Sequence, residues 1–83
     1  MYNIIKVREM KEEILKLLPI TSYITMINWL HHHGVEHLHD FVDWYVTGQE
    51  NEYYEIDIWI EDSFLMVRYD ANGNYIRHEE EKR

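Results

Sequence analysis

Residues 53–61 read YYEIDIWIE, in which apolar side chains at every second position alternate with acidic or aromatic ones. A period of two places successive side chains on opposite faces of a β-strand. Ile56, Ile58 and Ile60 form the side that is expected to face a core. The segment is therefore predicted to be a half-buried strand, with the rest of the fold arranged around it.

Two further strands are predicted toward the C-terminus. Residues 61–63 read EDS, which is typical of a turn, and an apolar strand is expected over residues 64–69. Residues 70–73 read DANG, in which asparagine or glycine can adopt the positive φ of a hairpin turn. Residues 74–78 are expected to return as a third strand, and residues 79–83 to form a frayed tail.

Helices are predicted on the N-terminal side of these strands. Apolar residues recur at helical spacing over residues 4–18, and Pro19 is expected to end that helix. A second helix is predicted over residues 22–33, capped by its first serine or the preceding threonine and ended by Gly34 in a left-handed conformation. Residues 23–27 are rich in β-branched side chains, so a strand remains the alternative there.

A third helix is predicted over residues 35–47, with Gly48 closing it. Its apolar stripe consists of Leu38, Phe41, Val42, Tyr45 and Val46.

These elements predict one acidic α+β domain over residues 1–83, with three short N-terminal helices packed on one face of a three-stranded antiparallel β-meander. The other face of the sheet is expected to remain open. A hydrophobic content of 46% favours an ordered core, and the lack of cysteine excludes disulfides and cysteine-ligated zinc.

Composition also excludes several classes of function. The net charge of −8 disfavours direct binding to nucleic acid, which depends on neutralising phosphates. No segment approaches the roughly 20 apolar residues of a membrane span, and the N-terminus lacks an apolar signal-peptide run. A cytoplasmic protein without membrane contact is expected.

The negative charge is concentrated in the middle of the chain. Between Lys16 and Arg68 there is no lysine or arginine, and the nine acidic residues there are Glu36, Asp40, Asp43, Glu50, Glu52, Glu55, Asp57, Glu61 and Asp62. Ordinary solvated surfaces mix both signs, because like charges repel along helices and across strands. This segment therefore accounts for the net charge of the chain.

On the predicted strand, carboxylates two residues apart lie about 6.7 Å from one another on the exposed side. Aromatic rings on the same side are typical anchors of a protein interface. The predicted binding residues are Asp40, Asp43, Tyr53, Glu55, Asp57, Trp59, Glu61 and Asp62. They indicate a surface for a basic protein; the alternative is an acidic face that serves only solubility.

Five of the six histidines fall within residues 31–39. His33, His37 and His39 are the alternative metal ligands, with Asp40 as a further donor. Gly34 is expected to interrupt the helix between the first two, and His37 and His39 are expected to point to opposite sides of the third helix. A pH-responsive patch is the other interpretation, since nearby carboxylates favour the imidazolium form.

No phosphate-binding glycine loop, nucleophile elbow or other catalytic motif occurs, so neither an enzyme nor a cofactor is expected. The leading hypothesis is a protein-binding module that occludes a basic site of a nucleic-acid-binding or defence protein by charge mimicry. In general type, though not in any motif, the chain is similar to the small acidic inhibitors of phages and other mobile genetic elements. A histidine-centred metal-binding or pH-responsive protein is the first alternative, and a structural homodimer, paired by the sheet face or the third-strand edge, is the second.

Overall fold

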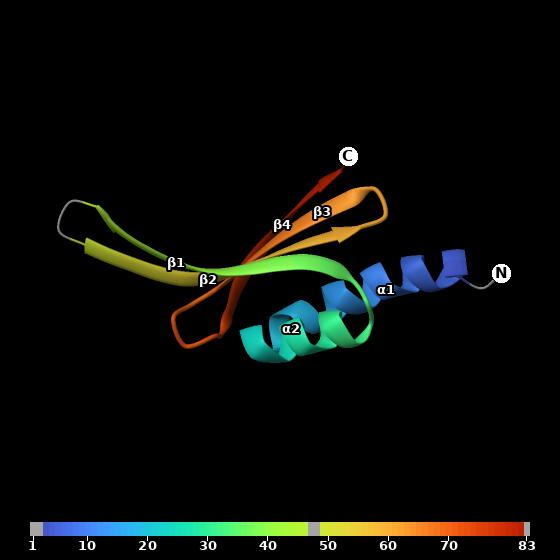
Figure 1. Ribbon diagram of the computed structural model, residues 1–83, viewed down its shortest axis with the longest axis horizontal. Coiled ribbons are helices and arrows are strands. Elements are labelled where there is room, and N and C mark those ends of the chain that lie inside the picture. The colour runs from blue at the N-terminus through green and yellow to red at the C-terminus, as the bar shows by residue number, and fades with distance from the viewer. Residues whose placement is uncertain (1–2, 47–48, 83) are drawn as a thin grey trace.

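The computed structural model describes residues 3–46 and 49–82. The elements in chain order are α1 (Asn3–Leu17), a short 3-10 helix η1 (Leu18–Ile20), α2 (Tyr23–His32), β1 (Glu36–Val46), β2 (Gln49–Ile60), β3 (Ser63–Tyr69) and β4 (Tyr75–Lys82). The strands form one antiparallel sheet in the order β1-β2-β3-β4. The fold is α+β, with two N-terminal helices packed on a four-stranded meander (Figure 1).

The first two predicted helices are confirmed. Pro19 lies within η1, immediately after α1. Ser22 caps α2, because its hydroxyl accepts a hydrogen bond of 3.3 Å from the backbone N–H of Thr25. Gly34 follows α2 with φ of 67°, as expected for a left-handed stop. The strand alternative for residues 23–27 is excluded, since they lie in α2.

The prediction of a third helix is wrong, because this segment forms the strand β1. Its apolar residues recur at helical spacing, although a strand can also place them on its two faces. As a strand, the segment pairs its backbone N–H and C=O groups with those of β2, with Phe41 opposite Tyr54 and His39 opposite Ile56. A neighbouring strand thus determines the conformation of β1, and the predicted closure at Gly48 lies outside the described residues.

The β1–β2 hairpin extends well beyond the rest of the sheet. β3 pairs with β2 only from Tyr54 to Ile60, whereas β1 pairs with β2 as far as Gln49. The stretch in which residues 42–46 pair with residues 49–53 is therefore two-stranded, and we call it the β-arm. It projects to the left in Figure 1 and contributes to a longest dimension of 54 Å.

The C-terminal segment is also more ordered than predicted. β4 continues to Lys82, so the segment expected to fray pairs with the start of β3. The predicted turn at residues 70–73 is confirmed: Gly73 has φ of 86° and donates a 2.9 Å hydrogen bond to the carbonyl of Asp70.

The core lies between the helices and the sheet. It confirms the predicted strand alternation, because Ile56 and Ile58 are fully buried and Ile60 is nearly so. The other buried apolar residues are Ile14, Leu18, Tyr23, Met26, Leu30, Val35, Leu65, Val67 and Tyr69. Within the described part of the chain, no helix is long and apolar enough to cross a membrane.

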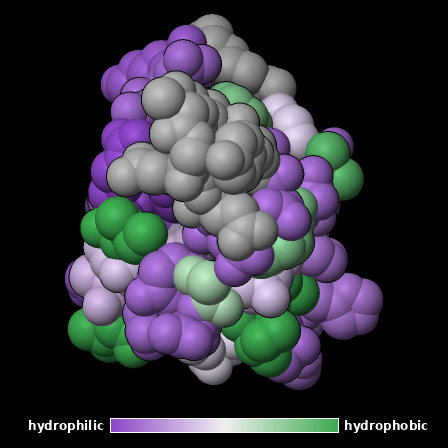
Figure 2. Space-filling model, turned by 90° about the vertical axis from the view of Figure 1, so that its left-hand side faces the viewer, coloured by the Kyte–Doolittle hydropathy of each residue, from purple (hydrophilic) through white to green (hydrophobic). Residues whose placement is uncertain are grey.

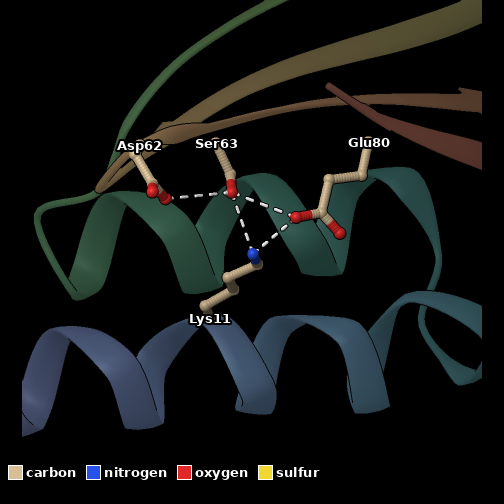
Figure 3. A network of polar contacts seen from close by, with 4 residues as sticks. All are labelled: Lys11, Asp62, Ser63 and Glu80. Carbon is tan, nitrogen blue, oxygen red and sulfur yellow. Dashed lines mark hydrogen bonds and ion pairs between the residues drawn. The ribbon is translucent and has the colours of Figure 1, made fainter. Parts of the chain in front are cut away.

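A polar network connects α1 to the end of the sheet at which β3 begins and β4 ends (Figure 3). The Lys11 ammonium donates a 2.8 Å hydrogen bond to the hydroxyl of the fully buried Ser63 and forms an ion pair with Glu80. Ser63 in turn donates to the Glu80 carboxylate at 3.0 Å. These bonds, led by the one from Lys11, lower the pKa of Glu80.

Lys11→Met is expected to lower the free energy of unfolding at neutral pH and to have little effect in strong acid. The folded pKa of Glu80 lies below its unfolded value, so its stabilisation is present at neutral pH and is lost as the pH falls through the folded value. Urea unfolding of wild type and variant at both pH values measures this. Lys16→Met, an exposed position on the same helix, is the control. A difference that persists unchanged in acid would contradict the role of the ion pair.

Candidate partner-binding face

One face of the sheet carries no helix, and we call it the open face (Figure 1). Since residues paired across antiparallel strands share a face, the register determines which side chains it presents. They are Glu36, Leu38, Asp40 and Val42 from β1; Tyr53, Glu55, Asp57 and Trp59 from β2; Phe64, Met66 and Arg68 from β3; and Arg77, Glu79 and Glu81 from β4.

A shallow groove of about 240 Å³ crosses the open face between β1 and β2. It is lined by Leu38, His39, Asp40, Val42, Glu55 and Asp57, and we call it the carboxylate groove. Strand pairing places Asp40 directly opposite Glu55, and Leu38 opposite Asp57. Leu38 is 64% exposed, so the groove combines three carboxylates with accessible apolar surface.

The carboxylates of the groove are crowded and incompletely solvated. Burial raises the pKa of Glu55, and so do a hydrogen bond with Asp57 and the negative charges of Asp57 and Asp40; the charge of Arg68 acts in the opposite direction. Oδ1 of Asp57 is buried and has no hydrogen-bond partner among the described residues. A cationic group placed here would relieve both conditions.

Glu55→Gln is expected to raise the free energy of unfolding at neutral pH. The folded pKa of Glu55 lies above its unfolded value, so the stability that its protonated form contributes is fully present below the unfolded pKa and is lost as the pH rises through the folded pKa. The variant should therefore lose less stability between pH 4 and pH 7, as measured by urea unfolding. Glu12→Gln, at an exposed helix position, controls for the change in net charge. Equal pH profiles for wild type and Glu55→Gln would contradict this assignment.

The fold also brings positive charge to the open face. Arg68 lies opposite Glu55, and its guanidinium is 4.1 Å from the centre of the Tyr53 ring. Arg77 lies opposite Arg68 and forms a 2.9 Å ion pair with Glu79. The long stretch without bases is thus partly compensated in space on the β3–β4 side, whereas the β1–β2 side remains acidic.

The predicted binding residues separate into three places. Asp40, Tyr53, Glu55, Asp57 and Trp59 share the open face, where Trp59 is half-buried with its ring 5.1 Å from that of Phe64. Asp43 belongs to the opposite face of β1. Glu61 and Asp62 are exposed in the β2–β3 turn.

Sequence reasoning missed Leu38 and Val42 as groove residues, because it assigned them to a helix. The signal that could have identified them is their spacing: Leu38 and Val42 each lie two positions from Asp40, so on a strand all three side chains share one face.

The histidines form no metal centre in the described part of the chain, where no group of three or more ligating side chains is positioned to hold an ion. His33 stacks on Trp29 with ring centres 3.9 Å apart, and Nδ1 of His37 lies 2.8 Å from the carbonyl of Val35. The expectation that His37 and His39 diverge is wrong: on a strand they share a face, and their ring centres are 6.0 Å apart.

On the face seen from the β-arm end, exposed apolar side chains are dispersed (Figure 2). Figure 2, viewed from the β-arm end, shows hydrophobic residues in separate patches between hydrophilic ones. The large exposed ones among the described residues are Ile20, Ile24, Leu38, Phe41 and Ile76. Of these, only Leu38 lies in the carboxylate groove.

No protein-family profile, curated protein or solved structure matches this chain. Its function is therefore inferred from the geometry of the site.

Proposed function

We propose that this chain is a protein-binding module whose carboxylate groove receives a lysine or arginine side chain from a basic partner. The observation that carries the proposal is the gathering of Asp40, Glu55 and Asp57 beside the exposed Leu38. A guanidinium offers several donors to carboxylates in fixed geometry, and its aliphatic stem packs well on apolar surface. In the groove, the carboxylates can bind the charged group of such a side chain, and Leu38 can pack against its aliphatic stem.

The charges of the open face limit how the partner lies. On the β3–β4 side the positive charges of Arg68 and Arg77 offset the nearby glutamates, whereas Glu36 and Asp40 attract a basic surface to the β1–β2 side. We expect the interface to follow β1 and β2 and to include Tyr53 and Trp59 at its margin. Association should be fast and salt-sensitive, because opposite charges steer the encounter.

The chemistry of the groove favours one kind of partner. Proteins that bind nucleic acids neutralise the phosphates with lysine and arginine side chains, and these side chains can also bind carboxylates. We propose that the chain occludes such a cleft on a nucleic-acid-binding or defence protein, acting as an inhibitor by charge mimicry. We expect the chain to meet such a target in the cytoplasm.

The test is affinity capture from a host lysate at low and moderate salt, with wild type beside Glu55→Lys/Asp57→Lys. Glu79→Lys/Glu81→Lys, which makes the same charge change on the β4 side of the open face, is the matched control. Circular dichroism establishes that all three proteins are folded.

We expect wild type and the control to capture a basic nucleic-acid-binding protein, and to capture less of it at higher salt. Glu55→Lys/Asp57→Lys should capture none. Equal capture by both double variants, or no capture by wild type, would overturn it.

A further inference from the structure

β1 is an edge strand with one side unpaired among the described residues. Eleven residues pair with β2 on one side, and the sheet order leaves the other side of β1 without a strand. Its flanking side chains are accessible, including Leu38 and the 43% exposed Phe41. The outward N–H and C=O groups of such an edge are a template for another strand.

The two edges of the sheet differ in how they are protected. β4 carries charged side chains at five of its eight positions, which is the usual protection of a sheet edge. β1 has three acidic residues in eleven, interspersed with apolar and histidine side chains. The edge formed by β1 is thus the less protected one.

We propose that β1 pairs antiparallel with β1 of a second copy of this chain, about a two-fold axis at Phe41. This residue is the midpoint of Glu36–Val46, so this register pairs the whole strand. It places His39 of each copy opposite Asp43 of the other, since positions equally distant from the axis face one another. The favourable pair therefore occurs twice.

Other registers are less complementary. A two-fold axis at Asp40 or Asp43 would set identical carboxylates directly opposite each other, which destabilises a strand pair. An axis at His39 or Val42 would pair fewer residues of β1. Asp43 already lies opposite Glu52 within its own sheet, so a histidine from the second copy on its other side reduces that repulsion.

Such a dimer would join two four-stranded sheets into one continuous sheet, with all helices on the same side. The two open faces would then be continuous, and the two carboxylate grooves would lie next to each other across the axis. Asp40 of one copy would approach its equivalent diagonally, at about 7–8 Å. This inference goes beyond the proposed function, and its tests need no partner.

The absence of cysteine from the chain allows a direct test of the register. Phe41→Cys places two thiols opposite each other, within the Cα separation that a disulfide requires. Mild oxidation under native conditions is expected to give a covalent dimer. Leu38→Cys is the matched control, because its two copies would be about 20 Å apart along the strands. Equal cross-linking of the two variants, or none of Phe41→Cys, would overturn the register.

A charge exchange tests the same pairing without cysteine. Asp43→Lys and His39→Glu are each expected to weaken the dimer about tenfold, because each variant removes the symmetric pair twice. The double variant His39→Glu/Asp43→Lys should restore it, and Asp62→Lys, at an exposed turn position, should leave it unchanged. Sedimentation equilibrium measures all four beside wild type. A wild-type chain that stays monomeric at high concentration, or a dimer insensitive to both single variants, would contradict the proposal.

Discussion

Leu65→Ala is expected to lower the free energy of unfolding by about 3 kcal/mol, the usual cost of truncating a buried leucine. Leu65 is 0% exposed and lies in the middle of β3, on the face covered by the helices. Truncation removes its contacts and leaves a cavity that the paired strands on either side can fill only in part. A chain of 83 residues has a total stability of about 4–12 kcal/mol, so this loss is a large fraction of it.

The neighbouring Met66→Ala is the matched control, because it lies on the same strand with its side chain on the open face. Its cost is expected to be below about 1 kcal/mol. Urea unfolding of wild type and both variants gives the comparison. Similar losses for Leu65→Ala and Met66→Ala would mean that both faces of the sheet are equally packed, and the assignment of an open face would fail.

Glu55→Lys/Asp57→Lys is expected to weaken binding of the captured partner by at least about 100-fold. Truncating one member of a desolvated charge pair at an interface costs about 2–5 kcal/mol, and reversal adds repulsion. Both carboxylates line the groove from half-buried positions two residues apart on β2, so the two changes act on the same bound cation. Isothermal titration calorimetry with the purified partner measures the loss.

A graded series separates the contribution of charge from that of shape. Glu55→Gln/Asp57→Asn keeps the shape and removes the charge, so it should lie between wild type and the reversal, with a weaker dependence on salt. Glu79→Lys/Glu81→Lys should bind like wild type, since it alters the β4 side of the open face. An unchanged affinity for the reversal variant would exclude the carboxylate groove as the binding site.

The parts of the fold that could be predicted are those in which local signals agree. Three alternating isoleucines specified β2, and Pro19 and Gly34 bounded the two helices. β1 was not predictable in the same way, because its apolar residues recur at helical spacing and neighbouring ones, such as Phe41 and Val42, interrupt a strict strand alternation. Pairing with β2, a tertiary interaction, determines the outcome.

The same limit applies to the candidate site. The grouping of Tyr53, Glu55, Asp57 and Trp59 on one face followed from alternation alone. The position of Asp40 beside Glu55, and of Arg68 on the other side of Glu55, depends on strand registers that no short segment encodes. The continuation of β4 through three glutamates likewise depends on its pairing with β3 and on the bond between Lys11 and Glu80.

The β-arm is a place at which the chain can gain or lose residues without disturbing the rest of the sheet. Its two strands pair with no third strand, so removing or adding residues beyond Val42 and Tyr53, which belong to the open face, changes no pairing of β3 or β4. Because side chains alternate with a period of two, insertions or deletions of two residues in each strand keep every remaining side chain on its face. Related chains could therefore differ in reach at this end while retaining the same core and the same groove.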